Sequence, residues 1–309
     1  MKKLGILLYI DDSKEMLEDF SWIYKSWIFS KNYFNSDLIA VCHPNVVNNL
    51  PSEPGIIKLI QSPYSDIHIE WKNYKFINSI ACLCGPEIEM LVDKYEYFLR
   101  TDADVFLTSH LVNFYPNRPV HGRGLYANPI FSTNTDGLTD LTENDVWTKI
   151  IQFANKHGYK HHRVHNCGHS LLAKPEDVLF FLREQLKLTK LLKDEFDSIG
   201  PGKWPGWYGG VITMYAAEIV ANHYFDRYLR GAHLNILDRE SYFAGPIDCL
   251  TLHIHAIHTH DYFSKHKFRE GKYKDININK IDISKINNYA HYICQSTVSD
   301  IKYAVNYPY

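Results

Sequence analysis

The chain has 309 residues, of which 45% are hydrophobic and 22% charged, and its formal net charge at pH 7 is −2. These values are typical of a globular protein with room for one large α/β domain or two small ones. The near-neutral charge excludes a global attraction to nucleic acid or to an acidic membrane.

The N-terminus carries a short apolar run, Leu4 to Ile10, which superficially resembles a signal peptide. The run ends on two aspartates without a small-residue cleavage site, and this favours a buried first strand. No other run approaches the roughly 18 apolar residues that span a bilayer. The six cysteines form no Cys-x-x-Cys pair, which is typical of reduced thiols. We therefore expect a cytoplasmic protein without a transmembrane segment.

The first third of the chain alternates strand-like and helix-like segments. Continuous apolar runs predict buried strands at 4–10, 38–42, 55–62 and 95–101. Apolar residues at helical spacing predict helices at 14–30, 73–83 and 86–94. Ser13 is the expected N-cap of the first helix. This order predicts a mostly parallel sheet with helices packed on its faces.

The second half is more irregular. Strands are predicted at 122–127, 169–173 and 250–260, and helices at 175–193 and 211–222. A loop rich in glycine and aromatic residues occupies 202–210. A helical stripe between Ile286 and Ile293 predicts a C-terminal helix that packs on the body.

Two carboxylates, Asp102 and Asp104, interrupt a hydrophobic stretch that reads FLRTDADVFLT. An Asp-x-Asp pair by itself is close to what chance produces, so its context carries the argument. In parallel α/β sheets ligands bind beyond the carboxyl ends of the strands, and this pair directly follows a predicted strand. Side chains at i and i+2 of an extended chain point the same way, so both carboxylates can face one hard cation. We expect a metal site here, and a solvated turn or helix cap is the alternative.

The segment FLRTDADVFLT resembles the Asp-x-Asp segment of GT-A-type glycosyltransferases, which use nucleotide-sugar donors, and the strand order of residues 4–268 is similar to theirs. The resemblance implies an α/β, Rossmann-like GT-A fold, with a mostly parallel central sheet flanked by helices and a C-terminal helical extension. We expect one catalytic domain over 1–270, composed of a nucleotide-binding half, 1–108, and an acceptor or sugar half, 109–270. Residues 271–309 would form the extension.

The resemblance also implies metal chemistry. Asp104 would bind a divalent cation, Mn²⁺ or Mg²⁺, that holds the donor diphosphate, and Asp102 would contact the ribose or a metal-bound water. A late histidine often supplies a third ligand in this family, and a basic residue near the diphosphate follows it. These roles correspond here to His258 or His260, and to Lys265 and Lys267.

The histidines fall in LTLHIHAIHTH at 250–260. Its even positions form an apolar face that His258 and His260 continue beyond the core, whereas His253 and His255 would face the other way, toward solvent or other elements. A purely structural role for the histidines is the alternative. A zinc site built of histidines alone lacks the usual His-x-x-x-His spacing.

Contacts to the donor are predicted at two places in the nucleotide-binding half. In related folds the segment after the first strand holds the nucleobase, so Tyr9 and Asp11 are candidates. Lys75 and Asn78 lie one helical turn apart in WKNYKFINS and could reach the donor together. An ordinary amphipathic helix with exposed polar residues is the alternative.

Two further segments are candidates for sugar binding. HNCGHSLLAKP resembles the family's Asn-x-Gly segment near the donor sugar, and its candidates are Asn166, Gly168 and His169. The alternative is a turn that enters a strand. In GKWPGWYGG the aromatic side chains could stack on sugar faces, and these are Trp204, Trp207 and Tyr208. The alternative is a loop anchored by a buried tryptophan.

We interpret the chain as a metal-dependent glycosyltransferase that moves a sugar, a hexose or a pentose, from a UDP- or GDP-sugar to a hydroxyl group. The acceptor could be a glycan, a protein, a small molecule or a nucleic acid. If the reaction inverts the anomeric centre, a base is needed, and Glu218, Asp145 and His169 all remain open. The alternatives are a non-catalytic carbohydrate-binding module and a sugar nucleotidyltransferase. The latter would normally show a glycine-rich phosphate loop, which ILLYIDDSKE lacks.

Overall fold

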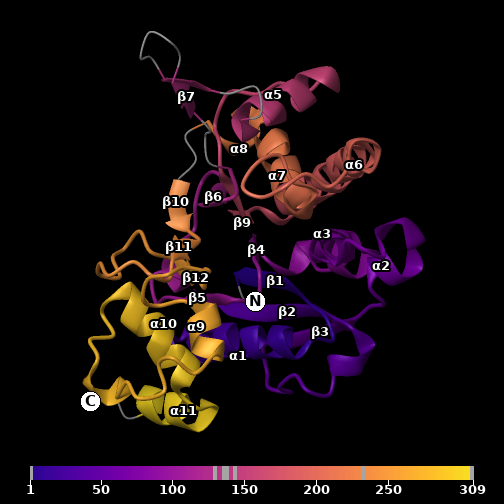
Figure 1. Cartoon of the computed structure of the whole chain (residues 1–309). Coiled ribbons are helices and arrows are strands. Elements are labelled where there is room, and N and C mark those ends of the chain that lie inside the picture. Colours follow the sequence, from indigo (N-terminus) through magenta and orange to yellow (C-terminus); the bar gives the residue numbers. More distant parts are fainter. Residues whose placement is uncertain (1–2, 128–130, 134–138, 142–144, 231–233, 307–309) are drawn as a thin grey trace.

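A seven-stranded sheet, ordered β10-β6-β9-β4-β1-β2-β3, runs through the centre of the molecule (Figure 1). The structure is a computed structural model that describes residues 3–127, 131–133, 139–141, 145–230 and 234–306. The strands of this sheet are β1 (Leu4–Ile10), β2 (Ser36–Cys42), β3 (Ile56–Ile60), β4 (Tyr97–Arg100), β6 (Val120–Arg123), β9 (Cys167–Ala173) and β10 (Leu234–Leu237). Strand β9 pairs antiparallel with β4 and β6, and the other four pairings are parallel. The predicted α/β class with a mostly parallel, helix-flanked sheet is confirmed.

Strand β1 is buried along its whole length because the sheet is covered on both faces. Successive side chains of a strand point to opposite faces, and β1 divides accordingly: Leu7 and Tyr9 enter one hydrophobic core, and Ile6 and Leu8 enter the other. This two-sided burial is the reason why the strand reads as an unbroken apolar run.

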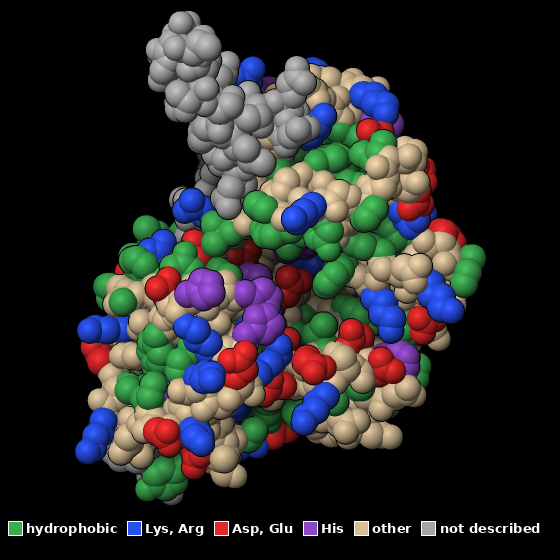
Figure 2. All heavy atoms as spheres, in the orientation of Figure 1, with side chains coloured by type: hydrophobic (Ala, Val, Ile, Leu, Met, Phe, Trp, Pro, Cys, Tyr) green, Lys and Arg blue, Asp and Glu red, His purple; other side chains and the backbone are tan. Residues whose placement is uncertain are grey.

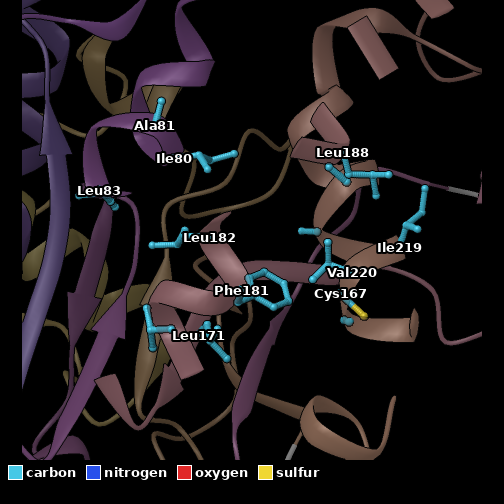
Figure 3. Close-up of a cluster of buried hydrophobic side chains, with 14 of the residues drawn as sticks. Ile80, Ala81, Leu83, Cys167, Leu171, Phe181, Leu182, Leu188, Ile219 and Val220 are labelled. Atoms are coloured by element: carbon cyan, nitrogen blue, oxygen red, sulfur yellow. The ribbon is translucent and has the colours of Figure 1, made fainter. Parts of the chain in front are cut away.

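Helices α3 (Asn78–Ala81), α5 (Val146–Lys156), α6 (Pro175–Ile199) and α7 (Ile212–His223) cover the first face. Figure 3 shows Ile80, Leu182, Ile219 and Leu171, from α3, α6, α7 and β9, in this cluster. Helix α6 begins with Pro175 and carries two acidic residues in its first turn, as its sequence predicts.

The second face is covered by α1 (Lys14–Phe29), α10 (Ile286–Gln295) and a small sheet. That sheet has the order β11-β12-β5, with β5 at Val105–Leu107, β11 at Arg239–Glu240 and β12 at His253–His255. The hydroxyl of Ser13 accepts a hydrogen bond from the amide of Met16, which confirms Ser13 as the N-cap of α1.

The C-terminal helices α10 and α11 (Val298–Asn306) pack against α1 (Figure 1). Ile286, Tyr289 and Ile293 enter the second core, so the predicted helical stripe is confirmed. The division at residue 270 stays a prediction. The remaining elements are α2 (Tyr64–Ile67), α4 (Pro86–Glu89), α8 (Phe225–Tyr228), α9 (Lys265–Arg269), β7 (Phe131–Thr133) and β8 (Thr139–Leu141). Within the described residues, no helix is both long and apolar enough to cross a membrane.

Some predicted elements are shorter than expected. The helices predicted at 73–83 and 86–94 are reduced to α3, α4 and short 3-10 turns, and Gly85, with its extended backbone, lies between α3 and α4. The strand predicted at 250–260 covers only His253–His255. Its partner β5 begins at Val105, so the chain beyond Ala256 has no strand edge to pair with.

Candidate functional site

Several chain segments meet at one edge of the central sheet. The parallel strands β1 and β4 end there, so Asp11 and Asp102 follow on neighbouring strands. Strand β9 runs the other way, and its first residues, including His169, therefore start at this same edge. Strand β10 lies parallel to β6 and ends there as well. In Figure 2, histidine and acidic side chains gather around a hollow in the middle of the molecule.

Asp102 and Asp104 stand directly beyond the end of β4. The amide of Thr101 still donates to the carbonyl of Leu7 on β1, at 3.0 Å. The Asp102 side chain is 33% exposed, whereas that of Asp104 is 10% exposed. The prediction that both carboxylates leave the strand at its carboxyl end is therefore confirmed.

Asp104 is held between two cationic partners. Its Oδ1 lies 3.3 Å from Nε2 of His255, and its Oδ2 accepts a hydrogen bond from Nζ of Lys265. Burial alone would raise the pKa of Asp104, but Lys265 and His255 outweigh it and hold this pKa well below the usual value. Burial would lower the pKa of His255, yet Asp104 raises it to about 9. In the cation-free protein near pH 7, Asp104 is therefore ionised and His255 protonated.

Asp102 is paired with Arg100, whose guanidinium is buried inside the sheet. Nη2 of Arg100 lies 3.2 Å from Oδ1 of Asp102, and Nη1 donates to the carbonyl of His169 at 2.8 Å. Burial works to raise the pKa of Asp102, but Arg100 and then His169 overcome this, so the pKa is lowered overall. In the sequence, an arginine at the end of an otherwise apolar strand could have indicated that Asp102 has a buried cationic partner.

The histidine that reaches Asp104 is His255, which sequence reasoning placed on the opposite face. Strands β12 and β5 pair antiparallel with His255 opposite Val105, and this register brings the ring next to Asp104. His258 and His260 lie beyond the strand and are exposed. His258 stacks on His266, with ring centroids 3.8 Å apart. The structure thus brings His255, rather than His258 or His260, into contact with Asp104, because the strand ends at His255. His258 remains within electrostatic range of Asp104.

The two predicted lysines differ in position. Lys265 faces Asp104, as described above, whereas Nζ of Lys267 donates to the carbonyl of His260. Behind Lys265, Arg269 binds Asp19 at 2.6 Å and Glu18 at 2.7 Å, so the basic stretch is tied to α1. Lys265 is therefore the lysine that the structure brings to the site.

His169 lies at the start of β9, within electrostatic range of Asp102. Both ring nitrogens are buried, and neither has a hydrogen-bond partner among the residues that the structure describes. Burial and then Arg100 lower the pKa of His169 to about 4, so its imidazole is neutral at pH 7.

The two residues predicted with His169, Asn166 and Gly168, have structural roles. Asn166 Nδ2 donates to the carbonyl of Ala127 at 2.8 Å, and its Oδ1 accepts from the amide of the same residue at 3.0 Å. Gly168 has no room for a side chain, because a Cβ atom would lie 2.6 Å from Oδ2 of Asp238 and 2.5 Å from the backbone of Gly122. Both polar groups of Asn166 are thus used within the protein, and a turn that enters a strand explains this segment.

The candidates near the nucleotide differ in accessibility. The hydroxyl of Tyr9 is buried and has no hydrogen-bond partner within the described part of the chain, and burial raises its pKa. Asp11 accepts hydrogen bonds from the amide and the hydroxyl of Ser13, at 2.8 and 2.6 Å. Lys75 is exposed. Asn78 is buried, and its amide exchanges hydrogen bonds with Ser65, at 2.9 and 3.0 Å. The Asn78 side chain is therefore already satisfied inside the protein, and of the predicted pair only Lys75 is exposed; a donor contact stays a prediction.

The aromatic loop divides in a similar way. Trp207 stacks on Tyr215 with ring centroids 4.6 Å apart, and on Phe196 at 5.0 Å. It therefore anchors the loop to the first core. Trp204 is 44% exposed, and the Tyr208 amide donates to the hydroxyl of Tyr215 at 3.3 Å. Of the three aromatic side chains, Trp204 is the most open for stacking on a sugar.

Glu218 belongs to a separate buried cluster. Its carboxylate accepts hydrogen bonds from Tyr126, the Asn166 amide, His161 and His165, at 2.7, 2.6, 3.3 and 2.8 Å. Nδ1 of His161 accepts from the amide of Arg163, so the proton of the neutral ring sits on Nε2 and faces Glu218. A cation could bind His161 at this position only through a free lone pair on Nε2, which the proton occupies. This cluster is therefore a hydrogen-bonded carboxylate, and it offers no open base to an acceptor.

Asp145, another candidate base, is buried at the N-terminus of α5. Its Oδ2 accepts a hydrogen bond from the amide of Thr148 at 2.9 Å, which makes it a helix cap. Neither it nor Glu218 has a hydrogen bond or ion pair with Asp102 or Asp104 among the described interactions.

The residues at the sheet edge fit a hard divalent cation. Ligand atoms of Asp102, Asp104 and His255 lie within 4.8 Å of one another. Carboxylate oxygens and one imidazole nitrogen suit Mn²⁺, and carboxylates with water suit Mg²⁺. The positive charges of Lys265 and protonated His255 offset Asp104 in the cation-free protein, and a cation can replace them.

Comparison with known proteins places the chain in one family. Residues 1–306 match the family described as Domain of unknown function (DUF7164). The chain belongs to this family. No curated protein matches its sequence. A solved structure of 4-diphosphocytidyl-2C-methyl-D-erythritolsynthase from Anaerococcus prevotii DSM 20548 is similar over 73% of this chain and 99% of that chain, with 13% identity and a TM-score of 0.33. A TM-score this low supports no conclusion about the activity of this chain.

Proposed function

We propose that this member of the DUF7164 family is a metal-dependent glycosyltransferase of the GT-A type, which transfers a sugar from a UDP- or GDP-sugar to a hydroxyl acceptor. The observation that carries the proposal is the convergence of Asp102, Asp104 and His255 at the carboxyl edge of the sheet. Ligands bind at this edge in open α/β sheets, and the same edge holds a lysine beside the carboxylates.

Asp104 and His255 would hold Mn²⁺ or Mg²⁺ directly, and Asp102 would complete the site or contact the ribose. A divalent cation supplies charge neutralisation for the diphosphate that leaves. Arg100 keeps Asp102 ionised and in place. Lys265 would turn from Asp104 to the diphosphate, where its ammonium stabilises the same negative charge.

The remaining groups would position the donor and the acceptor. Asp11 follows β1 at this edge and would approach the nucleoside, whereas Tyr9 lies within β1 with its hydroxyl buried and would line the site from below. Trp204 is exposed and would offer an aromatic face to a sugar. Among the three candidate bases, His169 is the one that lies within electrostatic range of Asp102, but its pKa lowered to about 4 and its buried ring nitrogens make it a weak base, so we assign no base.

The test is donor hydrolysis. Purified protein is incubated with Mn²⁺ and a panel of UDP- and GDP-sugars, and release of the nucleoside diphosphate is followed by chromatography. We expect slow hydrolysis of one donor, which Asp104→Ala abolishes. Absence of hydrolysis and of donor binding across the panel, or an Asp104→Ala variant as active as the wild type, refutes the proposal. Glycan binding that ignores both nucleotide and Mn²⁺ would instead identify a carbohydrate-binding module.

A further inference from the structure

Asp238 is a buried carboxylate directly behind the proposed cation site. It lies between β10 and β11, and only 4% of its surface is exposed. Its backbone is left-handed, with φ at +57°, which few residues other than glycine, asparagine and aspartate tolerate. A buried charge in a strained backbone position costs stability, so its surroundings must compensate for it.

The neighbouring strands are built around this carboxylate. A Cβ atom on Gly122 would lie 1.6 Å from Oδ2 of Asp238, and one on Gly168 would lie 2.6 Å from the same atom. Two glycines on two different strands therefore leave the space that the carboxylate fills. This is the physical reason for a glycine at position 168, which sequence reasoning assigned to the donor sugar.

The two oxygens of Asp238 have different partners. Oδ2 accepts a hydrogen bond from the amide of Ser170 at 3.3 Å, and Oδ1 accepts one from the hydroxyl of the same residue at 2.7 Å. Oδ1 also faces two imidazoles, with Nδ1 of His255 at 3.8 Å and Nε2 of His253 at 3.7 Å. The His255 ring thus lies between two carboxylates, with Nε2 toward Asp104 and Nδ1 toward Asp238.

We propose that Asp238 is a positioning residue for His255: its carboxylate retains the proton on Nδ1, so that Nε2 presents its lone pair to the cation beside Asp104. Metal-bound histidines generally donate their second ring N–H to a carboxylate or carbonyl, which fixes the tautomer and strengthens the ligand. The 3.8 Å separation is longer than a hydrogen bond and closes to one with a shift of about 1 Å. The inference rests on the proposed function only in so far as His255 binds a cation.

Asp238→Asn is the sharpest variant. Asparagine has nearly the same size and tolerates the left-handed backbone, so the fold is preserved. However, an amide has one acceptor oxygen, and both oxygens of Asp238 face donors. The fixed backbone N–H of Ser170 will take the carbonyl oxygen, which turns the NH₂ group toward Nδ1 of His255. Nδ1 must then lose its proton, and Nε2 carries the proton in place of a cation.

The readout is Mn²⁺ affinity without nucleotide, measured from the free Mn²⁺ signal in electron paramagnetic resonance. We expect Asp238→Asn to weaken binding roughly 10- to 100-fold. Ser170→Ala is the matched control: it removes one hydrogen bond from Asp238 but keeps the carboxylate, and should change the affinity less than about twofold. In a His255→Ala background, Asp238→Asn should likewise cost less than about twofold.

Three outcomes overturn the inference: unchanged affinity in Asp238→Asn, an equal loss in Ser170→Ala, or the same loss with and without His255. The last two would mean that Asp238 acts on the fold rather than on the ring. Failure of the glycosyltransferase proposal looks different, because Mn²⁺ binding and its dependence on Asp238 would remain while no donor is hydrolysed. A wild-type protein that does not bind Mn²⁺ refutes both.

Discussion

Nε2 of His255, on β12, lies 3.3 Å from Oδ1 of Asp104, which directly precedes β5, the strand that pairs antiparallel with β12 although the two are far apart in the chain. The contact places an imidazole beside the second carboxylate of the Asp-x-Asp pair. Of the four histidines between 250 and 260, His255 is the one whose ring contacts Asp104.

The first prediction concerns this choice of histidine. His255→Ala removes a ligand, so we expect Mn²⁺ affinity to fall by roughly 10-fold or more. His258→Ala and His260→Ala are the controls: both side chains are exposed beyond the end of β12, although His258 lies within electrostatic range of Asp104. Titration with Mn²⁺ compares the three variants. A loss in either control as large as that in His255→Ala would contradict the assignment.

Binding of Mn²⁺ should depend on pH. His255 has a pKa of about 9 in the cation-free protein, and its Nε2 must lose a proton before it can bind the cation. From about pH 6 to pH 8 the deprotonated fraction grows about tenfold per unit, so the affinity should rise by a similar factor and level off above about pH 9. Asp104, with its lowered pKa, remains ionised throughout. Calorimetry in buffers of different ionisation enthalpy should show about one proton released per Mn²⁺ at pH 7. No proton release would count against His255 as a ligand.

Lys265→Met should weaken nucleotide binding without weakening Mn²⁺ binding. Lys265 competes with the cation for Asp104, so its removal should leave Mn²⁺ binding unchanged or tighter. Loss of its contact with the diphosphate should weaken nucleotide binding about tenfold or more, because hydrogen bonds between charged groups contribute about 1.5–3 kcal/mol. Lys267→Met, whose lysine donates to the carbonyl of His260, is the control. Parallel losses of both ligands in Lys265→Met would contradict this role.

Glu218→Gln should lower stability without removing activity. Every partner of this buried carboxylate is a donor, and the NH₂ group of glutamine would oppose one of them. The expected loss is on the order of 3 kcal/mol in the free energy of unfolding, measured by denaturant titration. Donor hydrolysis per folded molecule should stay within about threefold of the wild type. Loss of hydrolysis in a fully folded variant would restore Glu218 as a candidate base.

Two tryptophans of the 202–210 loop should behave differently. Trp207→Ala removes a ring stacked on Tyr215 and Phe196, and should cost on the order of 3 kcal/mol of stability. Trp204→Ala removes an exposed ring and should leave the thermal midpoint nearly unchanged while it weakens sugar binding. A Trp204→Ala variant with wild-type affinity for both donor and acceptor sugars would exclude the stacking role.

The sequence was informative wherever a residue's position in the fold follows from its neighbours along the chain. The apolar run before Asp102 forces a buried strand, and the change to charged residues marks its end. Ser13 and Pro175 mark helix starts through local chemistry that does not need the rest of the fold. For Asn78, by contrast, polarity predicted an exposed side chain, and its contacts with Ser65 instead bury it. For Trp207 the sequence left sugar stacking and loop anchoring open, and the contact with Tyr215 decides for anchoring.

By itself the sequence determined the α/β class, the edge of the sheet at which Asp102 and Asp104 stand, and the two faces that bury β1. These features depend on the spacing of apolar residues along the chain, because that spacing decides directly which side chains are buried. Only the tertiary structure decided that His255 rather than His258 reaches Asp104, and that Asp238 fills the space beside Gly122 and Gly168. Both depend on the pairing of strands distant in the chain, and a shift of one residue in register would turn the other histidines toward the site.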